Sequence, residues 1–367
     1  MNGIKIIGLG GALPSRTVTN DDLGKIMDTS DAWIYPRTGI HERKFCSEEE
    51  SALTLAVEAG KRAILDAGIS KEEIGAVVVA SMSPDLATPS MAALVQRELG
   101  LPEVPALDLN AACSGFIYAI EVARGLLEAN LSIYDIYPEL DIPDREKTIR
   151  KSALIIGTEQ LSRLISMEDR TTAILFGDGA GACVVTSDDF KDEKNKSNFA
   201  DANSGEKKVA GTCTGYVSLL GSRGSGAIEA PSVYSRAYDS KYRRKEESVE
   251  IDHMLMDGKD VFVFACDIIP RIINGLLKKT GLELEDIDHV VCHQANARII
   301  RHVIRSMHAP QEKFYMNMEK YGNISAASIP IALNEMHEKG LLKKGEKMIL
   351  AGFGGGLTWG GCMISYN

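Results

Sequence analysis

The chain has 367 residues, with 41 Lys and Arg against 51 Asp and Glu, which gives a net charge of −10. Binders of nucleic acid or anionic membranes need a basic surface, so this balance argues against both classes. Hydrophobic residues make up 44% of the chain, but no apolar run approaches the roughly 20 residues of a membrane span.

The first predicted elements alternate between strands and helices. The stretch 1–15 has no charged segment before a long apolar core, so we expect a first strand and not a signal peptide. Residues 51–67 place apolar side chains on one helical face, and 76–81 form a short buried strand. A helix is predicted over 114–129 and a strand over 151–159. This alternation predicts an α/β protein with largely buried sheets.

Later segments are more irregular. Residues 171–186, TTAILFGDGAGACVVT, are predicted to form a hairpin interrupted by glycines. The stretches 131–150, 187–208 and 239–250 break the pattern, and the second is polar and poor in large apolar residues. We interpret all three as surface segments, the first two of them insertions.

The second half of the chain repeats the first weakly, but in order. The repeat is clearest between DAGISKEEIGAVVVA (66–80) and KTGLELEDIDHVVCH (279–293), each a glycine-ended helix, an acidic turn and a buried strand. Three more pairs follow in the same order: 107–115 with 314–325, 153–159 with 348–354, and 179–186 with 358–365. Such a series predicts a duplicated α/β unit.

We therefore divide the chain into two similar halves. The N-terminal half is predicted to span 1–187 and the C-terminal half 209–367, with a polar surface insertion at 188–208. No flexible linker separates the halves into independent domains.

Seven cysteines are scattered along the chain without a CxxC pair. The odd number and the spacing argue against a disulfide framework and against a zinc site. A reduced, cytoplasmic compartment fits this pattern best.

One cysteine, Cys113, ends a predicted strand and precedes a predicted helix. A helix start presents unpaired N–H groups and partial positive charge, so we expect it to stabilise the thiolate. The small neighbours Ala111, Ala112, Ser114 and Gly115 leave room for a substrate, as in a nucleophile elbow with sulfur in place of oxygen. The alternative is a merely buried small side chain, which we prefer for the other six cysteines.

The repeat brings two further side chains into the argument. If the halves are related by pseudo-symmetry, corresponding strand ends converge, and DHVVCHQANARI (288–299) and YGNISAAS (321–328) lie near Cys113. The first places His293 after a strand, and the second places Asn323 between a glycine and a helix start. Each signal is weak alone. Together they predict a site made of a thiol, an imidazole and a carboxamide.

The motifs AACSGF, HQANARI, YGNISAAS and GFGGGLTWG carry a resemblance that runs along almost the whole chain. Together with DAWIYPRTGIHERKF, DRTTAILFGDGAGA and DGKDVFVFA, they resemble the β-ketoacyl-acyl-carrier-protein synthase III family of the thiolase superfamily. The resemblance implies the five-layered αβαβα thiolase fold with duplicated halves, and a homodimer. It also implies a decarboxylating Claisen condensation that initiates fatty acid synthesis.

The resemblance assigns roles to the three candidate side chains. Cys113 would take the acyl group of an acyl-CoA starter, and His293 and Asn323 would stabilise the enolate formed from malonyl-acyl-carrier protein. Both of these side chains can donate hydrogen bonds, whereas a carboxylate would only accept them and would repel the enolate. The amides of Cys113 and Gly355 would form the oxyanion hole. No metal or redox cofactor is implied, and acyl-CoA is a substrate.

The resemblance also implies a binding path for CoA. Trp33 and Arg37 would sandwich the adenine with Arg170 beside it, which is physically sensible for a purine between an indole and a guanidinium. Asn296 and Phe262 would line the tunnel that leads to the thiol. Without the resemblance, Trp33 would be interpreted as a surface or core anchor.

Two predictions concern specificity. Arg298, Arg301 and Arg305 share one helix face, where we expect acidic carrier protein to dock; a solvated helix face is the alternative. Thr88 stands where family members restricted to acetyl starters often carry phenylalanine, and its smaller size predicts room for a branched or longer starter.

Other functions remain as alternatives. A thiolase-fold synthase of secondary metabolism could keep the same Cys-His-Asn triad, and a cysteine hydrolase also uses Cys and His. A biosynthetic thiolase would need a second catalytic cysteine near the C-terminus, but Cys362 lies well beyond the glycine-rich loop. Hydroxymethylglutaryl-CoA synthase would need a catalytic glutamate, for which no motif matches.

Overall fold

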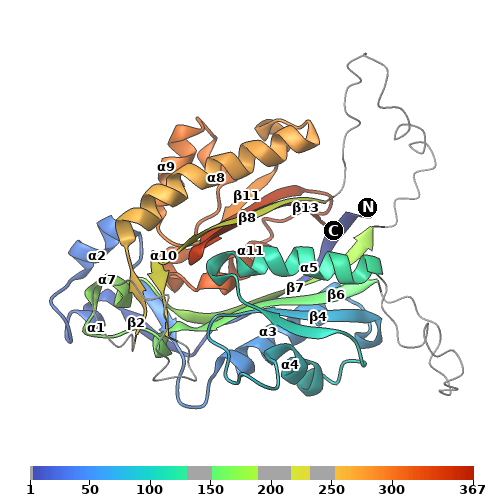
Figure 1. Cartoon of the computed structure of the whole chain (residues 1–367), viewed down its shortest axis with the longest axis horizontal. Helices are drawn as coiled ribbons and strands as arrows, with labels where there is room; N and C mark the ends of the chain where they lie inside the picture. Colours follow the sequence, from blue (N-terminus) through green and yellow to red (C-terminus); the bar gives the residue numbers. More distant parts are fainter. Residues whose placement is uncertain (1–2, 130–150, 189–215, 232–252) are drawn as a thin grey trace, which may run out of the picture.

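The computed structural model describes residues 3–129, 151–188, 216–231 and 253–367. Within these ranges, helices and strands stack in five alternating layers of helices, sheet, helices, sheet and helices (Figure 1). The predicted surface segments at 131–150 and 239–250, and the stretch 189–208, lie outside the described residues. No helix in the described ranges is long and apolar enough to cross a lipid bilayer.

The first sheet layer has the strand order β5-β4-β6-β7-β1. Its strands are β1 (Gly3–Ala12), β4 (Ile74–Ala80), β5 (Ala106–Leu109), β6 (Ser152–Gln160) and β7 (Asp178–Asp188). Strand β4 is parallel to β5 and β6, whereas β7 is antiparallel to β6 and β1. Helices α3 (Ala52–Ala67) and α4 (Met91–Leu99) cover its outer face (Figure 1). The predicted first strand and the predicted helix at 51–67 are thus confirmed.

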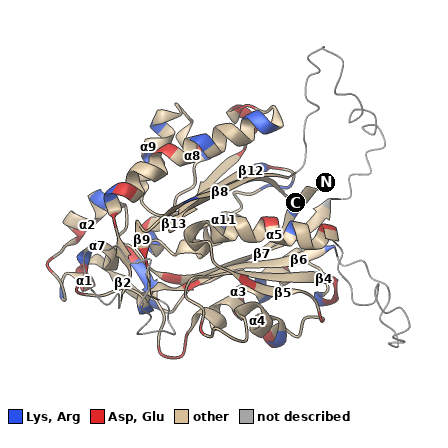
Figure 2. Ribbon diagram, viewed as in Figure 1, with Lys and Arg blue, Asp and Glu red and all other residues tan. Residues whose placement is uncertain are grey.

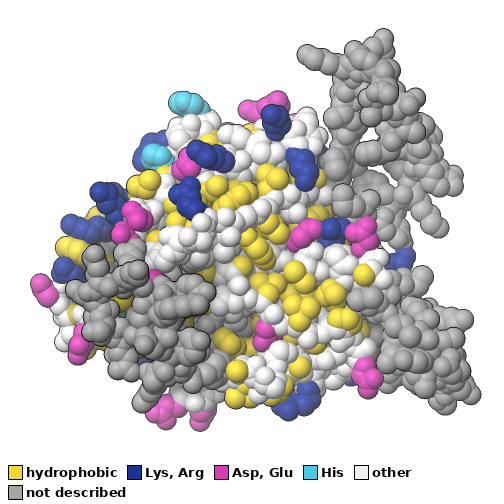
Figure 3. Space-filling model, in the orientation of Figure 1, with side chains coloured by type: hydrophobic (Ala, Val, Ile, Leu, Met, Phe, Trp, Pro, Cys, Tyr) yellow, Lys and Arg dark blue, Asp and Glu magenta, His cyan; other side chains and the backbone are white. Residues whose placement is uncertain are grey.

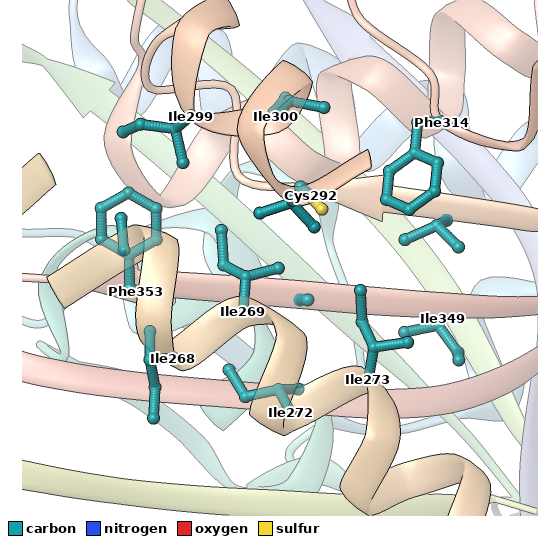
Figure 4. Packing of buried hydrophobic residues seen from close by; sticks show 14 of the residues in the cluster. Ile268, Ile269, Ile272, Ile273, Cys292, Ile299, Ile300, Phe314, Ile349 and Phe353 are labelled. Atoms are coloured by element: carbon teal, nitrogen blue, oxygen red, sulfur yellow. The ribbon is translucent and has the colours of Figure 1, made fainter. Parts of the chain in front are cut away.

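The second sheet layer has the order β11-β12-β13-β8. Its strands are β8 (Val217–Ser225), β11 (His289–Cys292), β12 (Lys347–Gly354) and β13 (Gly356–Tyr366). Its outer face is covered by α8 (Gly258–Thr280) and α9 (Ala297–Ser306). Isoleucines of α8 pack there with Ile349 and Phe353 of β12 (Figure 4). This apolar contact holds α8 and α9 against the sheet that contains β11, the strand directly before His293.

Two helices, α5 (Gly115–Ala129) and α11 (Ser328–Glu338), form the middle layer. Helix α5 contacts β4 and β6 on one side and β12 and β13 on the other, and α11 contacts β1, β7 and β11. The middle layer is therefore apolar on several faces, with Phe116 and Ile120 fully buried. The two sheets also join directly, where Lys5 and Ile6 of β1 pair with the end of β13.

The strand positions repeat between the two sheets. Strands β4, β6, β7 and β1 lie in the same order as β11, β12, β13 and β8. The glycines that end the preceding helices also match, since Gly68 has φ 63° and Gly281 has φ 72°. These left-handed conformations favour glycine. The predicted five-layered, duplicated α/β fold is confirmed, while the half boundaries at 187 and 209 stay a prediction.

Shorter helices and strands complete the described fold. They are β2 (Arg16–Thr19), α1 (Asn20–Leu23), α2 (Asp31–Thr38), β3 (Glu42–Phe45), α7 (Arg170–Ala173), β9 (Ile228–Glu229), β10 (Leu255–Met256) and α10 (Met318–Tyr321). Strand β2 pairs with β3, and β9 pairs with β10.

The predicted hairpin at 171–186 is wrong. Asp169 accepts a hydrogen bond from the amide of Thr171 at 2.8 Å and starts the short helix α7, and β7 then runs on as one strand. Gly179 and Gly181 lie within the strand and make no turn. Their role is to allow close packing against a helix. A Cβ at Gly181 would lie 2.6 Å from the amide nitrogen of Ile331. Glycine therefore lets α11 approach the sheet.

Candidate active site

Cys113 lies in a 3-10 helix, η2 (Ala112–Ser114), between β5 and α5, so its predicted place at a strand–helix junction is confirmed. Ala112, just before it, has φ 46°, a left-handed conformation that strains a residue with a side chain. The side chain of Asn110 accepts a hydrogen bond from the Ala112 amide at 3.0 Å and holds this turn. The backbone at the thiol is therefore tightly constrained.

A second junction of the same kind carries Asn323. It is η6 (Ser325–Ala327), which precedes α11 as η2 precedes α5. Ser325 has φ 45°, and its amide donates to the side chain of Asn323 at 2.9 Å. The backbone angles and the side-chain bond match those at η2, so Asn323 is the counterpart of Asn110. The carboxamide oxygen is held by this bond, which leaves its NH2 group free to donate.

His293 follows β11 and is fixed by its backbone amide, which donates to the carbonyl of Ala351 at 2.8 Å. The ring packs edge-on against Phe353, with 5.4 Å between ring centroids. Nδ1 is buried and has no hydrogen-bond partner among the described residues. Burial lowers the pKa of His293 to about 3, so the imidazole is neutral at physiological pH.

Cys113, His293 and Asn323 line one cavity, although they come from three segments that are far apart in the sequence. The cavity and its opening enclose about 640 Å³. Gly355, Asn296 and Phe262 line it too. The predicted convergence of the thiol, the imidazole and the carboxamide is therefore found in the structure.

The environment of the thiol differs from the expectation. Burial raises the pKa of Cys113 to about 12, and the hydrogen bond from Ser325 opposes this rise. The expectation that the helix start makes Cys113 a stabilised thiolate is therefore wrong for the free enzyme, because loss of hydration outweighs the helix terminus. A neutral imidazole and a protonated thiol therefore line the cavity.

The glycine-rich loop between β12 and β13 lies directly against the nucleophile. A Cβ at Gly354 would lie 2.5 Å from the backbone nitrogen of Cys113, so only glycine permits this approach. The hydroxyl of Thr358 donates to the carbonyl of Ala111 at 2.9 Å and accepts from the hydroxyl of Ser114 at 2.7 Å. These bonds fasten the loop to η2 and hold Gly355 beside the thiol.

Of the residues predicted to bind CoA, Asn296 and Phe262 line the cavity, whereas Trp33, Arg37 and Arg170 are not part of its lining. The guanidinium of Arg37 lies 4.5 Å from the ring centroid of Trp33, and that of Arg170 lies 4.4 Å from it. Asn296 starts α9 by accepting from the Arg298 amide at 2.9 Å, and its NH2 group donates to the carbonyl of Arg37 at 3.0 Å. Asn296 thus ties the helix α9 to the helix that carries Trp33.

Basic side chains gather near this opening although the chain is acidic. Arg298, Arg301 and Arg305 are all exposed on α9, so their predicted common face is confirmed. The guanidinium of Arg298 lies 5.5 Å from the ring centroid of Phe262. Lys and Arg side chains are frequent at the end formed by α2, α8 and α9, and acidic side chains lie among them as well as over the rest of the molecule (Figures 2 and 3).

Comparison with known proteins identifies the family. The pattern described as 3-oxoacyl-[acyl-carrier-protein (ACP)] synthase III matches residues 146–206, and that of its C-terminal part matches 277–366. A β-ketoacyl-[acyl-carrier-protein] synthase III of Clostridium botulinum is 39% identical over 368 residues, which cover both chains completely. The 3-oxoacyl-[acyl-carrier-protein] synthase III structure from Aquifex aeolicus has a TM-score of 0.78 and 35% identity, over 99% of this chain and 100% of its own. That from Thermus thermophilus has a TM-score of 0.80 and 34% identity, over 99% of each chain.

The chain belongs to the β-ketoacyl-acyl-carrier-protein synthase III family.

Membership confirms the predicted activity, that of a condensing acyltransferase which initiates fatty acid synthesis. It also confirms the family resemblance predicted from the sequence. A cysteine hydrolase is excluded as the main activity of a synthase III.

The residues that line the cavity differ from those expected for the starter pocket. Thr88 is exposed on the loop after β4 and does not line the cavity of this synthase III. Met82, closer to the strand end, lines it instead, together with Met254 and Met256. Met82 and Met254 lie outside helices and strands and Met256 lies in the two-residue strand β10, so no periodic pattern in the sequence indicates that they line a pocket. A role for Thr88 stays a prediction, and it would require this loop to reach the cavity of a second copy.

The neutral state of His293 is a testable property of this synthase III. Its pKa near 3 lies below the ordinary 6.5, so between these two pH values the unfolded chain binds a proton at His293 and the folded chain does not. The free energy of unfolding is therefore not reduced by this residue above pH 6.5, and it decreases as the pH falls from 6.5 toward 3. In NMR spectra the ring Cε1 proton of His293, identified by its loss in His293→Asn, should therefore keep its neutral chemical shift from pH 8 to pH 5. A titration with its midpoint in that range would contradict the burial argument.

Proposed function

We propose that this synthase III transfers the acyl group of an acyl-CoA to Cys113 and then joins it to two carbons of malonyl-acyl-carrier protein. The observation that carries the proposal is the single cavity lined by Cys113, His293, Asn323 and Gly355. Intact-protein mass spectrometry after incubation with a panel of acyl-CoAs tests it. An acyl group should attach to Cys113, and absence of any adduct would contradict the proposal.

The first step makes the acyl-enzyme. The sulfur of Cys113 attacks the thioester carbon of the acyl-CoA, the carbon–sulfur bond to CoA breaks, and the thiol proton leaves with the CoA sulfur. The negative oxygen formed in between accepts hydrogen bonds from the amides of Cys113 and Gly355, which the glycine-rich loop holds at the thiol. Because the free thiol is protonated, loss of its proton accompanies substrate binding and attack.

The second step joins two carbon atoms. The malonyl carboxylate leaves as CO2, and its electron pair moves into an enolate at the thioester. Neutral His293 and the NH2 group of Asn323 donate hydrogen bonds to the enolate oxygen. The enolate carbon then attacks the acyl carbonyl on Cys113, and the cysteine sulfur leaves as a thiolate, which takes up a proton from solvent to restore the thiol. A neutral imidazole suits this role as a donor, whereas a cysteine hydrolase would use His as a base toward the thiol.

We propose that the CoA adenine binds at Trp33. In the free chain both Arg37 and Arg170 already stack against the indole. An adenine between Trp33 and Arg37 therefore requires the Arg37 guanidinium to swing aside, while its cation–π contact passes to the purine. Asn296 and Phe262 line the way from this site to the thiol.

Carrier protein is proposed to dock on the exposed arginines of α9. Arg298→Glu should weaken use of malonyl-acyl-carrier protein about fivefold, as expected for an exposed ion pair, and should leave the rate of acylation by acyl-CoA unchanged. Steady-state kinetics with each substrate varied in turn measures both effects. Arg97→Glu on α4, in the outer helix layer of the other sheet, is the matched control. Equal loss of both activities in Arg298→Glu would argue against docking there.

The starter group is proposed to include branched or longer acyl chains. The methionines that line the cavity, Met82, Met254 and Met256, can adapt their shape to a larger apolar group. Acylation of Cys113 by isobutyryl-CoA should therefore be at least as fast as acylation by acetyl-CoA. A preference for acetyl-CoA of more than about tenfold, the effect of one methylene group in a tight pocket, would contradict this prediction.

The homodimer and the residue roles above remain proposals of this kind. We expect the protein to sediment as a dimer at a concentration near that of the activity assay. The alternative synthase of secondary metabolism would share the Cys-His-Asn triad and the acyl-enzyme step.

A further inference from the structure

Gln294, the residue directly after His293, is buried, and the reaction steps above do not use its side chain. Its NH2 group donates to the carbonyl of Cys292 at 2.7 Å and to the carbonyl of Tyr315 at 3.1 Å. Its side-chain oxygen accepts from the backbone amide of Asn317 at 3.0 Å. One carboxamide therefore holds three backbone groups.

These partners suit glutamine and few other side chains. Two carbonyls require a donor, and the amide of Asn317 requires an acceptor on the same group. A glutamate in the ionised form accepts only and would face two carbonyl oxygens, whereas asparagine is too short by a methylene group. The bonds are thus specific to the carboxamide at this position.

The three bonds connect the segments that carry the two proposed enolate donors. Cys292 ends β11 and precedes His293. The segment 315–317 runs beside β11, where the amide of Tyr315 donates to the carbonyl of Val290 at 3.3 Å. It continues through α10 to Asn323. Gln294 therefore closes the junction between β11 and the chain that leads to Asn323.

Asn317 extends this network to the far side of Asn323. Its side-chain NH2 group donates to the carboxylate of Glu335 on α11 at 2.9 Å, and both residues are buried. Asn323 lies between Asn317 and Glu335 in the chain. The segment that carries the carboxamide is thus tied at both ends.

The direction of the His293 ring depends on its backbone. A histidine ring is usually oriented by a hydrogen bond at the nitrogen that does not react, but Nδ1 of His293 has no partner among the described residues. What fixes the ring is its contact with Phe353 and the turn at 292–294, whose two sides the Gln294 side chain joins.

We propose that Gln294 and Asn317 are positioning residues for condensation. The Gln294 carboxamide clamps the turn at His293 to the segment 315–317, and Asn317 carries the clamp on to α11. The imidazole of His293 and the carboxamide of Asn323 are thereby held so that both reach one enolate oxygen. This inference rests on the function proposed above for His293 and Asn323.

Gln294→Met tests the proposal, because methionine has a similar volume and makes none of these bonds. The rate of condensation at saturating malonyl-acyl-carrier protein should fall about tenfold, since the enolate donors are misplaced. Acylation by acyl-CoA and the KM for malonyl-acyl-carrier protein should stay within about twofold, because neither uses these donors. An unchanged condensation rate, an equal loss of acylation, or a rise in KM alone overturns the proposal.

The matched control is a glutamine that clamps two carbonyls elsewhere. The NH2 group of Gln96 on α4 donates to the carbonyls of Pro102 at 2.6 Å and Val104 at 3.3 Å, outside the cavity lining. Gln96→Met should lower the melting temperature but keep both half-reactions within about twofold. Comparable loss of condensation in this variant would show general loosening and overturn the proposal.

Two further variants cover the remaining outcomes. Asn317→Ala keeps the amide that binds Gln294 and removes the bond to Glu335, so condensation should fall about threefold with acylation unchanged. No loss of condensation in Asn317→Ala overturns the proposal even if Gln294→Met does not fold. Full condensation in His293→Ala would contradict the proposed function itself. Loss in His293→Ala without loss in Gln294→Met would contradict the positioning role alone.

Discussion

Cys113→Ala should abolish acyl-enzyme formation and lower the condensation rate by at least about 10³-fold, as expected when a nucleophile is removed. The reason is geometric as well as chemical. The strained turn at Ala112 and the bond from Asn110 place this one sulfur in the cavity, and no other cysteine of the described residues lines it. Intact mass after incubation with acyl-CoA and a coupled condensation assay measure the two losses.

The control for this variant is another buried cysteine. Cys183 on β7 is fully buried, and burial raises the pKa of its thiol well above the ordinary value, as at Cys113. Cys183→Ala should keep both the acyl adduct and the condensation rate within about twofold, with only a cost in stability from the small cavity. A Cys113→Ala protein that still condenses at full rate would remove the basis of the proposed mechanism.

Asn323→Asp should lower condensation by about 10²–10³-fold, the effect of losing one oxyanion donor. Aspartate keeps the acceptor for the Ser325 amide, now at 2.9 Å, so the turn is preserved. The NH2 donor is lost, and a buried carboxylate would repel the enolate. Acylation of Cys113 should fall much less, because that step uses the backbone amides. Rapid-quench measurement of each half-reaction distinguishes the two.

Asn110→Asp is the matched control, because Asn110 makes the same bond to the amide two residues later at 3.0 Å but is exposed. It should leave both half-reactions within about threefold of the parent. Equal damage from the two substitutions would mean that the turn, and not the carboxamide donor of Asn323, is what condensation requires.

Much of this account could be predicted from the sequence. Strand and helix periodicity gave the α/β class, and the ordered repeat gave the duplication, because each half must bury its own sheet with the same pattern of apolar residues. Cys113, His293 and Asn323 were found because each follows a strand end at matching places in the repeat. The position of the arginines on α9 followed from helical spacing alone.

Other features depended on contacts between segments far apart in the chain. Glycines in β7 resembled turn residues, but they serve close packing with α11, which no local pattern reveals. Met82, and not Thr88, reaches the cavity, because the path of the loop is set by tertiary contacts. The protonation states of Cys113 and His293 were decided by burial, since the loss of hydration exceeds what a helix terminus supplies.

The sequence by itself therefore determined which residues could react and that two similar units present them. Only the tertiary structure decided their charge states and the shape of the pocket. The physical reason is that periodicity and turn chemistry are local, whereas desolvation and close packing depend on neighbours that the fold brings from elsewhere in the chain.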